Sequence, residues 1–221
     1  MQSETPKKKV DYMEPTPAQY FWRTQRECWK RMVGPTIMYL FMGLILVAVQ
    51  AIPIAALKIV LGVLIILLGA FFNGHLMYQC GKKHYDNSLT GSFHRRNRAY
   101  GVMSGESHHI EREYSPWKGF YIGFLVGVPV ILLSVLAHFF YDVVTIVFII
   151  LAGWAITPIT WFGAIEGGGL KADVLWSMMM IILPIVVSGV FYIVGAIKEK
   201  KKKQQESERI EKLQNKGKKN K

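Results

Sequence analysis

Charged residues are scarce in two long stretches of this chain, and that scarcity is its most informative feature. Between residues 34 and 80 the only charged side chain is Lys58. Between residues 119 and 197 there are four, namely Asp142, Glu166, Lys171 and Asp173. One helical crossing of a bilayer needs roughly 20 apolar residues, so the two stretches together hold several crossings. The sequence therefore predicts an all-α, polytopic integral membrane helix bundle.

Recognisable motifs of catalysis and of metal binding are also missing. The triplet Gly167-Gly168-Gly169 lacks the Gly-Lys-Ser/Thr that completes a phosphate-binding loop. Four histidines, at positions 84, 94, 108 and 109, share one polar segment, but at irregular spacing and without a cysteine pair. We therefore interpret that segment as a solvated loop, expect no metal or cofactor, and lean towards a protein that is not an enzyme.

Cysteine is scarce, with only Cys28 and Cys80, and each lies at the end of a polar segment. Two cysteines placed in this way do not form a disulfide framework. We therefore expect no disulfide, in keeping with a reducing cytosolic side.

The charge that is present lies in three polar segments, and each of them is basic. Residues 1–33 and 81–118 each hold seven Lys/Arg and four Asp/Glu, and residues 198–221 hold eleven and four. Such segments either bind nucleic acid or flank membrane spans and face anionic lipid. We favour the second interpretation, because excess Lys/Arg beside spans is what sets membrane topology.

Five apolar segments divide the two uncharged stretches. They are residues 35–51, 57–79, 119–140, 143–165 and 174–197. The first two form a transmembrane hairpin within residues 34–80, and the others form a bundle of two or three spans within 119–197. Before the hairpin, aromatic and basic side chains alternate, as in a helix in the headgroup region or at the start of a span. After the bundle comes the basic tail, residues 198–221.

The fourth segment raises a conflict in topology. Five crossings would place the basic tail on the side opposite the other two basic segments, against the positive-inside rule. A re-entrant segment 143–165, broken at Gly153 and Pro158, would remove the conflict and imply a cavity, because non-helical backbone at membrane depth must be buried or line water. The segment is also long enough for a full span. Both alternatives remain open, with a slight preference for five helices that cross.

Two sets of residues in the apolar stretches are candidates for specific roles. Glycines at four-residue spacing, Gly119, Gly123 and Gly127, predict a helix face for close packing against another helix. Polar residues inside a membrane are functional hypotheses by default. The candidates of this kind are Asn73, His75 and Glu166.

Taken together, these features favour a membrane-embedded accessory or scaffold component. Its basic segments, above all Lys200, Lys201, Lys202 and Lys203, would bind anionic membrane lipid or a protein partner. The alternative is a small transporter or channel with a broken helix at 143–169, and a lipid-modifying enzyme comes third. We expect a bacterial inner membrane. The alternative is the endoplasmic reticulum, because the last four residues match a dilysine retrieval pattern.

Overall fold

The computed structural model describes residues 17–90, 114–161 and 176–219, and every regular element in these ranges is helical. The elements are α1 (Pro17–Val49), α2 (Ala55–Thr90), α4 (Pro116–Phe139), α5 (Tyr141–Trp161), the short 3-10 helix η1 (Ser177–Ile181) and α7 (Ile182–Lys219). The predicted all-α helical bundle is therefore confirmed. In α1, α2, α4 and the helix formed by η1 and α7, apolar stretches are long enough to cross a membrane.

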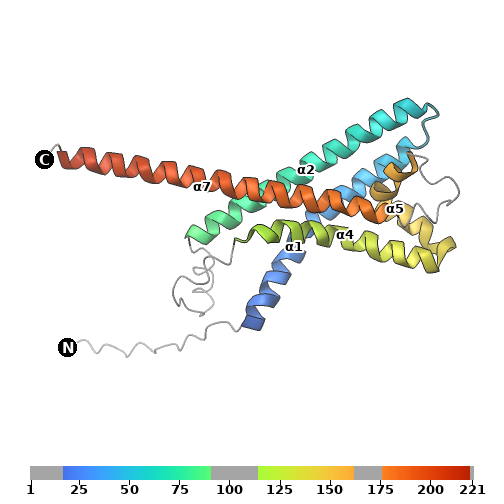
Figure 1. Ribbon diagram of the computed structural model, residues 1–221, viewed down its shortest axis with the longest axis horizontal. Helices are drawn as coiled ribbons and strands as arrows, with labels where there is room; N and C mark the ends of the chain where they lie inside the picture. Colours follow the sequence, from blue (N-terminus) through green and yellow to red (C-terminus); the bar gives the residue numbers. More distant parts are fainter. Residues whose placement is uncertain (1–16, 91–113, 162–175, 220–221) are drawn as a thin grey trace, which may run out of the picture.

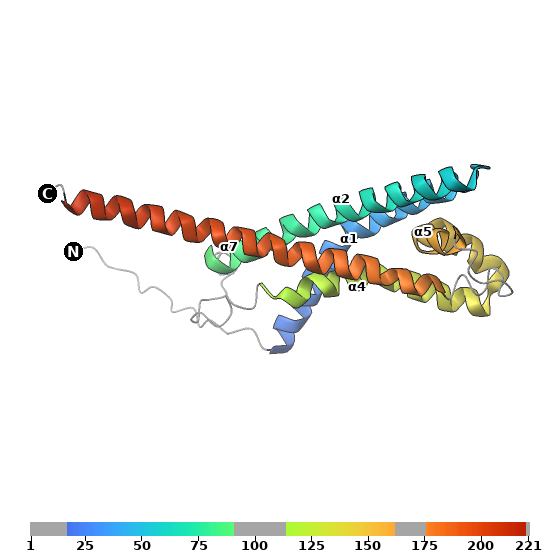
Figure 2. The same ribbon diagram turned by 45° about the horizontal axis from the view of Figure 1, so that its top comes forward.

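The four long helices run side by side, and their polar ends gather at one end of the molecule. In Figure 1 the start of α1, the end of α2 and the start of α4 lie at the left of the bundle, and α7 runs past them in the same direction. Figure 2 shows the same arrangement after rotation. We call this end, which carries Lys/Arg from all four helices, the basic end. The opposite end holds the turn between α1 and α2, and we call it the hairpin end.

Helices α1 and α2 extend well beyond the apolar segments predicted for them. Helix α1 is continuous from Pro17, so its aromatic and basic first turns are the start of the first spanning helix. Helix α2 continues to Thr90, and residues 81–90 are therefore helix, where the sequence had predicted the start of a polar loop. The part of α1 from Thr24 on and residues 81–88 of α2 pack against neighbouring helices, with Cys28, His84 and Ser88 buried.

Helix α5 differs from the four long helices. Ala152 has non-helical backbone angles (φ −122°, ψ 19°), and Pro158 lies inside the helix. At 21 residues α5 is shorter than each of the four long helices. Both α5 and the start of η1 lie at the hairpin end (Figures 1 and 2), so the described chain enters and leaves α5 at one end of the bundle.

This arrangement favours the four-crossing alternative over five crossings. With four crossings, all the basic ends face one side of a membrane and the positive-inside conflict disappears. The slight preference for five crossings rested only on the length of the apolar segment 143–165. Here α5 bends at Ala152 and lies at the hairpin end (Figure 1).

Close helix packing in this bundle depends on glycine. A Cβ atom on Gly123 would overlap the carbonyl oxygen of Pro184, and one on Gly119 would lie 2.6 Å from Cβ of Tyr192. The third residue of the series, Gly127, faces Ile181. The glycine face of α4 is thus turned towards η1 and α7 of the same chain.

Candidate functional site

The most elaborate polar arrangement in the described residues surrounds His84, near the end of α2. The His84 side chain is 1% exposed, and both of its ring nitrogens have partners. Nε2 lies 3.0 Å from a carboxylate oxygen of Glu27 in α1, and Nδ1 lies 2.8 Å from the hydroxyl of Tyr192 in α7. We call these three side chains the His84 cluster. It joins three helices at the basic end.

The chemistry of the His84 cluster is that of a fully satisfied imidazole. A carboxylate only accepts hydrogen bonds, so Nε2–H donates to Glu27, and Nδ1 is then free to accept the Tyr192 hydroxyl. The thiol of Cys80, one turn before His84, lies 3.7 Å from the same Nε2. Cys28, next to Glu27 on α1, is buried in the same apolar cluster, and both thiols are free.

Aromatic rings enclose the His84 cluster on its remaining side. The ring of Tyr114, just before α4, is stacked on Tyr192 with a centroid distance of 5.7 Å and an interplanar angle of 11°. Tyr85 packs edge-on against Tyr114. Burial, with a smaller contribution from Tyr85, raises the pKa of the Tyr114 phenol. The phenol therefore stays neutral at physiological pH, as suits an aromatic contact.

A second polar cluster lies deeper in the bundle, at Asn73. This residue is fully buried, and its side-chain amide nitrogen donates to the Tyr39 hydroxyl at 3.3 Å and to the Ser188 hydroxyl at 3.2 Å. The amide oxygen has no hydrogen-bond partner. We call Tyr39, Asn73 and Ser188 the Asn73 cluster. Like the His84 cluster, it joins α1, α2 and α7.

The structure separates the polar residues that the sequence had grouped together. Asn73 points into the bundle, whereas His75, two residues later, is exposed on its outer surface. The His75 ring instead stacks on Tyr78 with a centroid distance of 6.4 Å. Glu166 lies outside the described residues. A common cavity lined by Asn73 and His75 is therefore not formed.

The four candidate lysines of the tail lie on a part of α7 that continues past the bundle. Lys200, Lys201 and Lys202 are exposed, whereas Lys203 forms an ion pair of 3.0 Å with Asp86 of α2. One turn closer to the bundle, Lys82 of α2 pairs with Glu199 at 3.6 Å. Helices α2 and α7 therefore stay paired for a short distance past the bundle.

Sequence reasoning missed the His84 cluster, and its interpretation of His84 as part of a solvated loop was wrong. A weak signal did exist, because Cys80 and His84 are four residues apart and so share one face of a helix. Glu27 and Tyr192, however, are distant in sequence, and only the fold brings them to that face.

Within residues 17–90, 114–161 and 176–219, no three His, Cys, Asp or Glu side chains are arranged to hold a metal ion.

No protein family, curated protein or solved structure matches this chain. Its function must therefore be argued from its own residues.

Proposed function

We propose that this protein is a non-enzymatic membrane scaffold that presents a basic helical arm on one side of a membrane. The observation that carries the proposal is the continuity of α7. This helix runs without a break to Lys219, and its last 22 residues, 198–219, form what we call the arm. At 1.5 Å per residue the arm is about 33 Å long.

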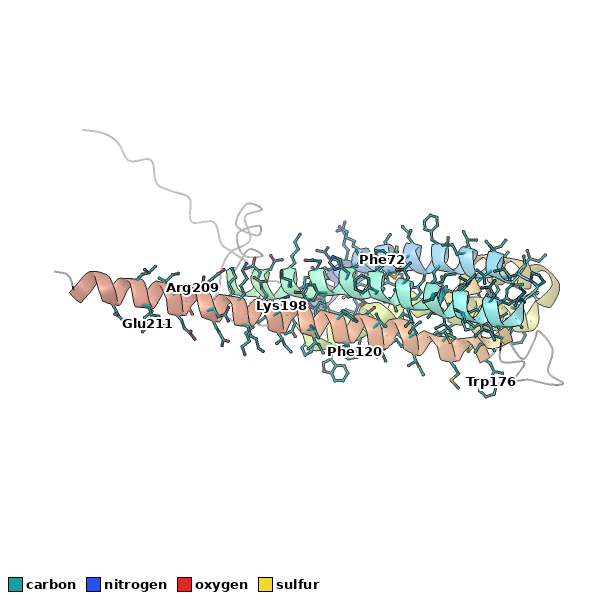
Figure 3. The ribbon with its side chains drawn as sticks, turned by 90° about the horizontal axis from the view of Figure 1, so that it is seen from above. Phe72, Phe120, Trp176, Lys198, Arg209 and Glu211 are labelled. Carbon is teal, nitrogen blue, oxygen red and sulfur yellow. The ribbon has the colours of Figure 1, made fainter. Side chains whose placement is uncertain are left out.

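That length decides which partners the arm can reach. The surface potential of anionic lipid falls off within a Debye length, about 8 Å at physiological salt. Only the first turns of the arm, with Lys200, Lys201 and Lys202, are close enough to a membrane to respond to it. The distal turns extend past the bundle, as Figure 3 shows at Arg209 and Glu211, and they are placed to meet a protein partner.

We further propose that the membrane is a bacterial inner membrane with the basic end facing the cytosol. The positive-inside rule supports this orientation, because each of the three basic segments adjoins that end. The endoplasmic reticulum remains the alternative, and it too would place the tail in the cytosol.

A transporter is the second candidate, and one observation favours it. The buried amide oxygen of Asn73 has no partner, and a buried acceptor of this kind suits a water or a solute. The kinked α5 lies close by, since Trp154 of α5 packs against Tyr39 with a centroid distance of 4.6 Å.

The two candidates can be distinguished genetically in the native host. A strain that lacks the protein would be complemented either with a chain truncated after Lys203 or with a full-length Asn73→Leu variant. We expect the truncated chain to fail and the Asn73→Leu variant to succeed, with both proteins present in the membrane at normal abundance. The reverse outcome would refute the scaffold and support transport.

The partner itself can be sought by photo-crosslinking. A benzophenone amino acid at Gln214, in the distal arm, should give a discrete protein adduct in cells. The same group at Leu67, which is exposed on the spanning part of α2, serves as the control. An adduct that forms equally from both positions would contradict docking by the arm.

A further inference from the structure

A group of cationic and aromatic side chains lies on the outer surface where α2 and α7 leave the bundle. The Lys82 ammonium lies 5.7 Å from the centroid of the Tyr78 ring, and the Lys198 ammonium lies 5.8 Å from the same centroid. One turn earlier on α2, the His75 ring is stacked on Tyr78. We call these four residues the Tyr78 site.

The backbone around Tyr78 fixes two helices close together at this point. A Cβ atom on Gly195 of α7 would overlap the carbonyl oxygen of Tyr78. One turn deeper, Gly74 of α2 faces the ring of Phe191 of α7. The side chains of the Tyr78 site therefore come from both helices but form one continuous surface.

The depth of the site matches the level of lipid headgroups. Trp29 of α1 and Trp117 of α4 are both exposed near the basic end, and exposed tryptophan marks the membrane–water interface. Gly119, two residues after Trp117, packs on Tyr192, and Tyr192 also contacts Gly81 next to Lys82. Lys82 and Trp117 thus lie at about the same level in the bundle.

An apolar surface continues from the site into the membrane. On α2 the side chains of Phe71 and Leu67, one and two turns before His75, are exposed, and on α7 the side chain of Val194, one turn before Lys198, is exposed. Going inward, the surface therefore passes from ammonium groups to aromatic rings to aliphatic groups. This is also the order of polarity along a phospholipid, from phosphate to glycerol to acyl chain.

We propose that the Tyr78 site binds the phosphate of an anionic phospholipid in the leaflet at the basic end. Lys198 and Lys82 contact the phosphate, and the rings of Tyr78 and His75 contact the glycerol region. Because Lys82 is shared with Glu199, Lys198 supplies the larger part of the charge offered to the lipid. This inference goes beyond the scaffold proposal, since it names a defined lipid site on the anchor and not on the arm.

The test is native mass spectrometry of the full-length protein with phosphatidylglycerol or with phosphatidylcholine of the same chains. We expect the anionic lipid to bind more tightly. Lys198→Gln should lower its affinity about fivefold, since one lysine near a lipid surface contributes to binding by about that factor. Tyr78→Leu should lower the affinity as well.

Lys200→Gln is the matched control, because it removes the same charge from the same helix. Lys200 lies two residues after Lys198 and so is rotated about 200° around α7; we expect a change of less than twofold. Equal losses for Lys198→Gln and Lys200→Gln would overturn the site in favour of general attraction to the basic end. Equal affinity for phosphatidylglycerol and phosphatidylcholine would also overturn it, since the site would then not recognise the anionic headgroup.

These outcomes are independent of those for the scaffold proposal. The adduct formed from Gln214 depends on the distal arm, so Lys198→Gln should leave it unchanged. A lost adduct with intact lipid binding would refute the scaffold alone, and the opposite result would refute the lipid site alone.

Discussion

Individual polar side chains in this bundle are kept in apolar surroundings by partners on other helices. Asn73 is the clearest case, because its amide nitrogen has two partners and its amide oxygen has none. A hydrogen bond between membrane helices contributes little net free energy, since the separated helices also find partners. The buried amide therefore stabilises the fold only modestly. Its main unfavourable contribution is the burial of the amide oxygen without a hydrogen-bond partner.

Replacing Asn73 by Leu should lower the free energy of unfolding by about 1 kcal/mol, because it leaves the Tyr39 and Ser188 hydroxyls without their donor. The measurement is reversible unfolding of the purified protein in mixed micelles. His75→Leu is the control on the same helix; being exposed, it should change the free energy of unfolding by less than about 0.5 kcal/mol. Equal effects at the two positions would contradict the burial of Asn73.

Substitution of His84 should lower the free energy of unfolding more than substitution of Asn73, because His84 forms hydrogen bonds with both a carboxylate and a phenol. We expect His84→Phe to lower the free energy of unfolding by about 2 kcal/mol, since the buried Tyr192 hydroxyl and the partly exposed Glu27 carboxylate both lose a hydrogen-bond partner. A double-mutant cycle with Tyr192→Phe should give a coupling energy of about 1 kcal/mol. Strictly additive effects would mean that the two side chains do not interact.

At the scale of the helical element, glycine decides which faces meet. The predicted glycine face of α4 packs against α7 of the same chain, with a carbonyl oxygen of α7 directly over Gly123. Substitution at Gly123 therefore acts first on the fold of this chain, whatever partners the protein has.

Gly123→Ala should destabilise the protein by about 2 kcal/mol or prevent its accumulation, because the new methyl group would overlap the Pro184 carbonyl and the two helices would have to separate. Gly34→Ala in α1 is the matched control. A Cβ atom there meets only Leu76 at 3.8 Å, an ordinary contact. Thermal unfolding of both variants in detergent provides the comparison, and a tolerated Gly123→Ala would contradict the close packing of α4 on α7.

The sequence did not predict how far α2 extends or how α5 is arranged in the bundle. Residues 81–90 carry Lys82, Lys83, His84 and Asp86, which resemble a loop when only composition is considered. They remain helical because one face is buried against α1 and α7. Conversely, the apolar length of 143–165 suggested a span, whereas the structure shows a helix over Tyr141–Trp161 that bends at Ala152 and lies at the hairpin end (Figure 1).

At the scale of the whole molecule, the number of crossings decides where the charges lie. Four crossings place the arm and the start of α1 on the same side of the membrane, with the turn between α1 and α2 on the other. The basic end then faces one aqueous compartment, and this is the premise of both the scaffold and the lipid site.

Single cysteines at Ser207 and Ala51, in a chain with Cys28 and Cys80 replaced by alanine, test this arrangement. In intact cells a membrane-impermeant maleimide should label position 51 and not position 207, and permeabilisation should expose position 207. The physical reason is that the basic end is retained in the cytosol. Labelling of both positions in intact cells would indicate an odd number of crossings.

The sequence by itself determined that this chain is a helical bundle with the make-up of a multi-pass membrane protein, with basic segments adjoining its spans. These properties are local, because the cost of placing a residue in a bilayer depends on the residue and its neighbours along the chain. Only the tertiary structure decided that Asn73 is buried while His75 is exposed, that His84 meets Glu27 and Tyr192, and that α5 stays at the hairpin end. Those outcomes depend on contacts between residues far apart in sequence, and no local pattern encodes which helix faces meet.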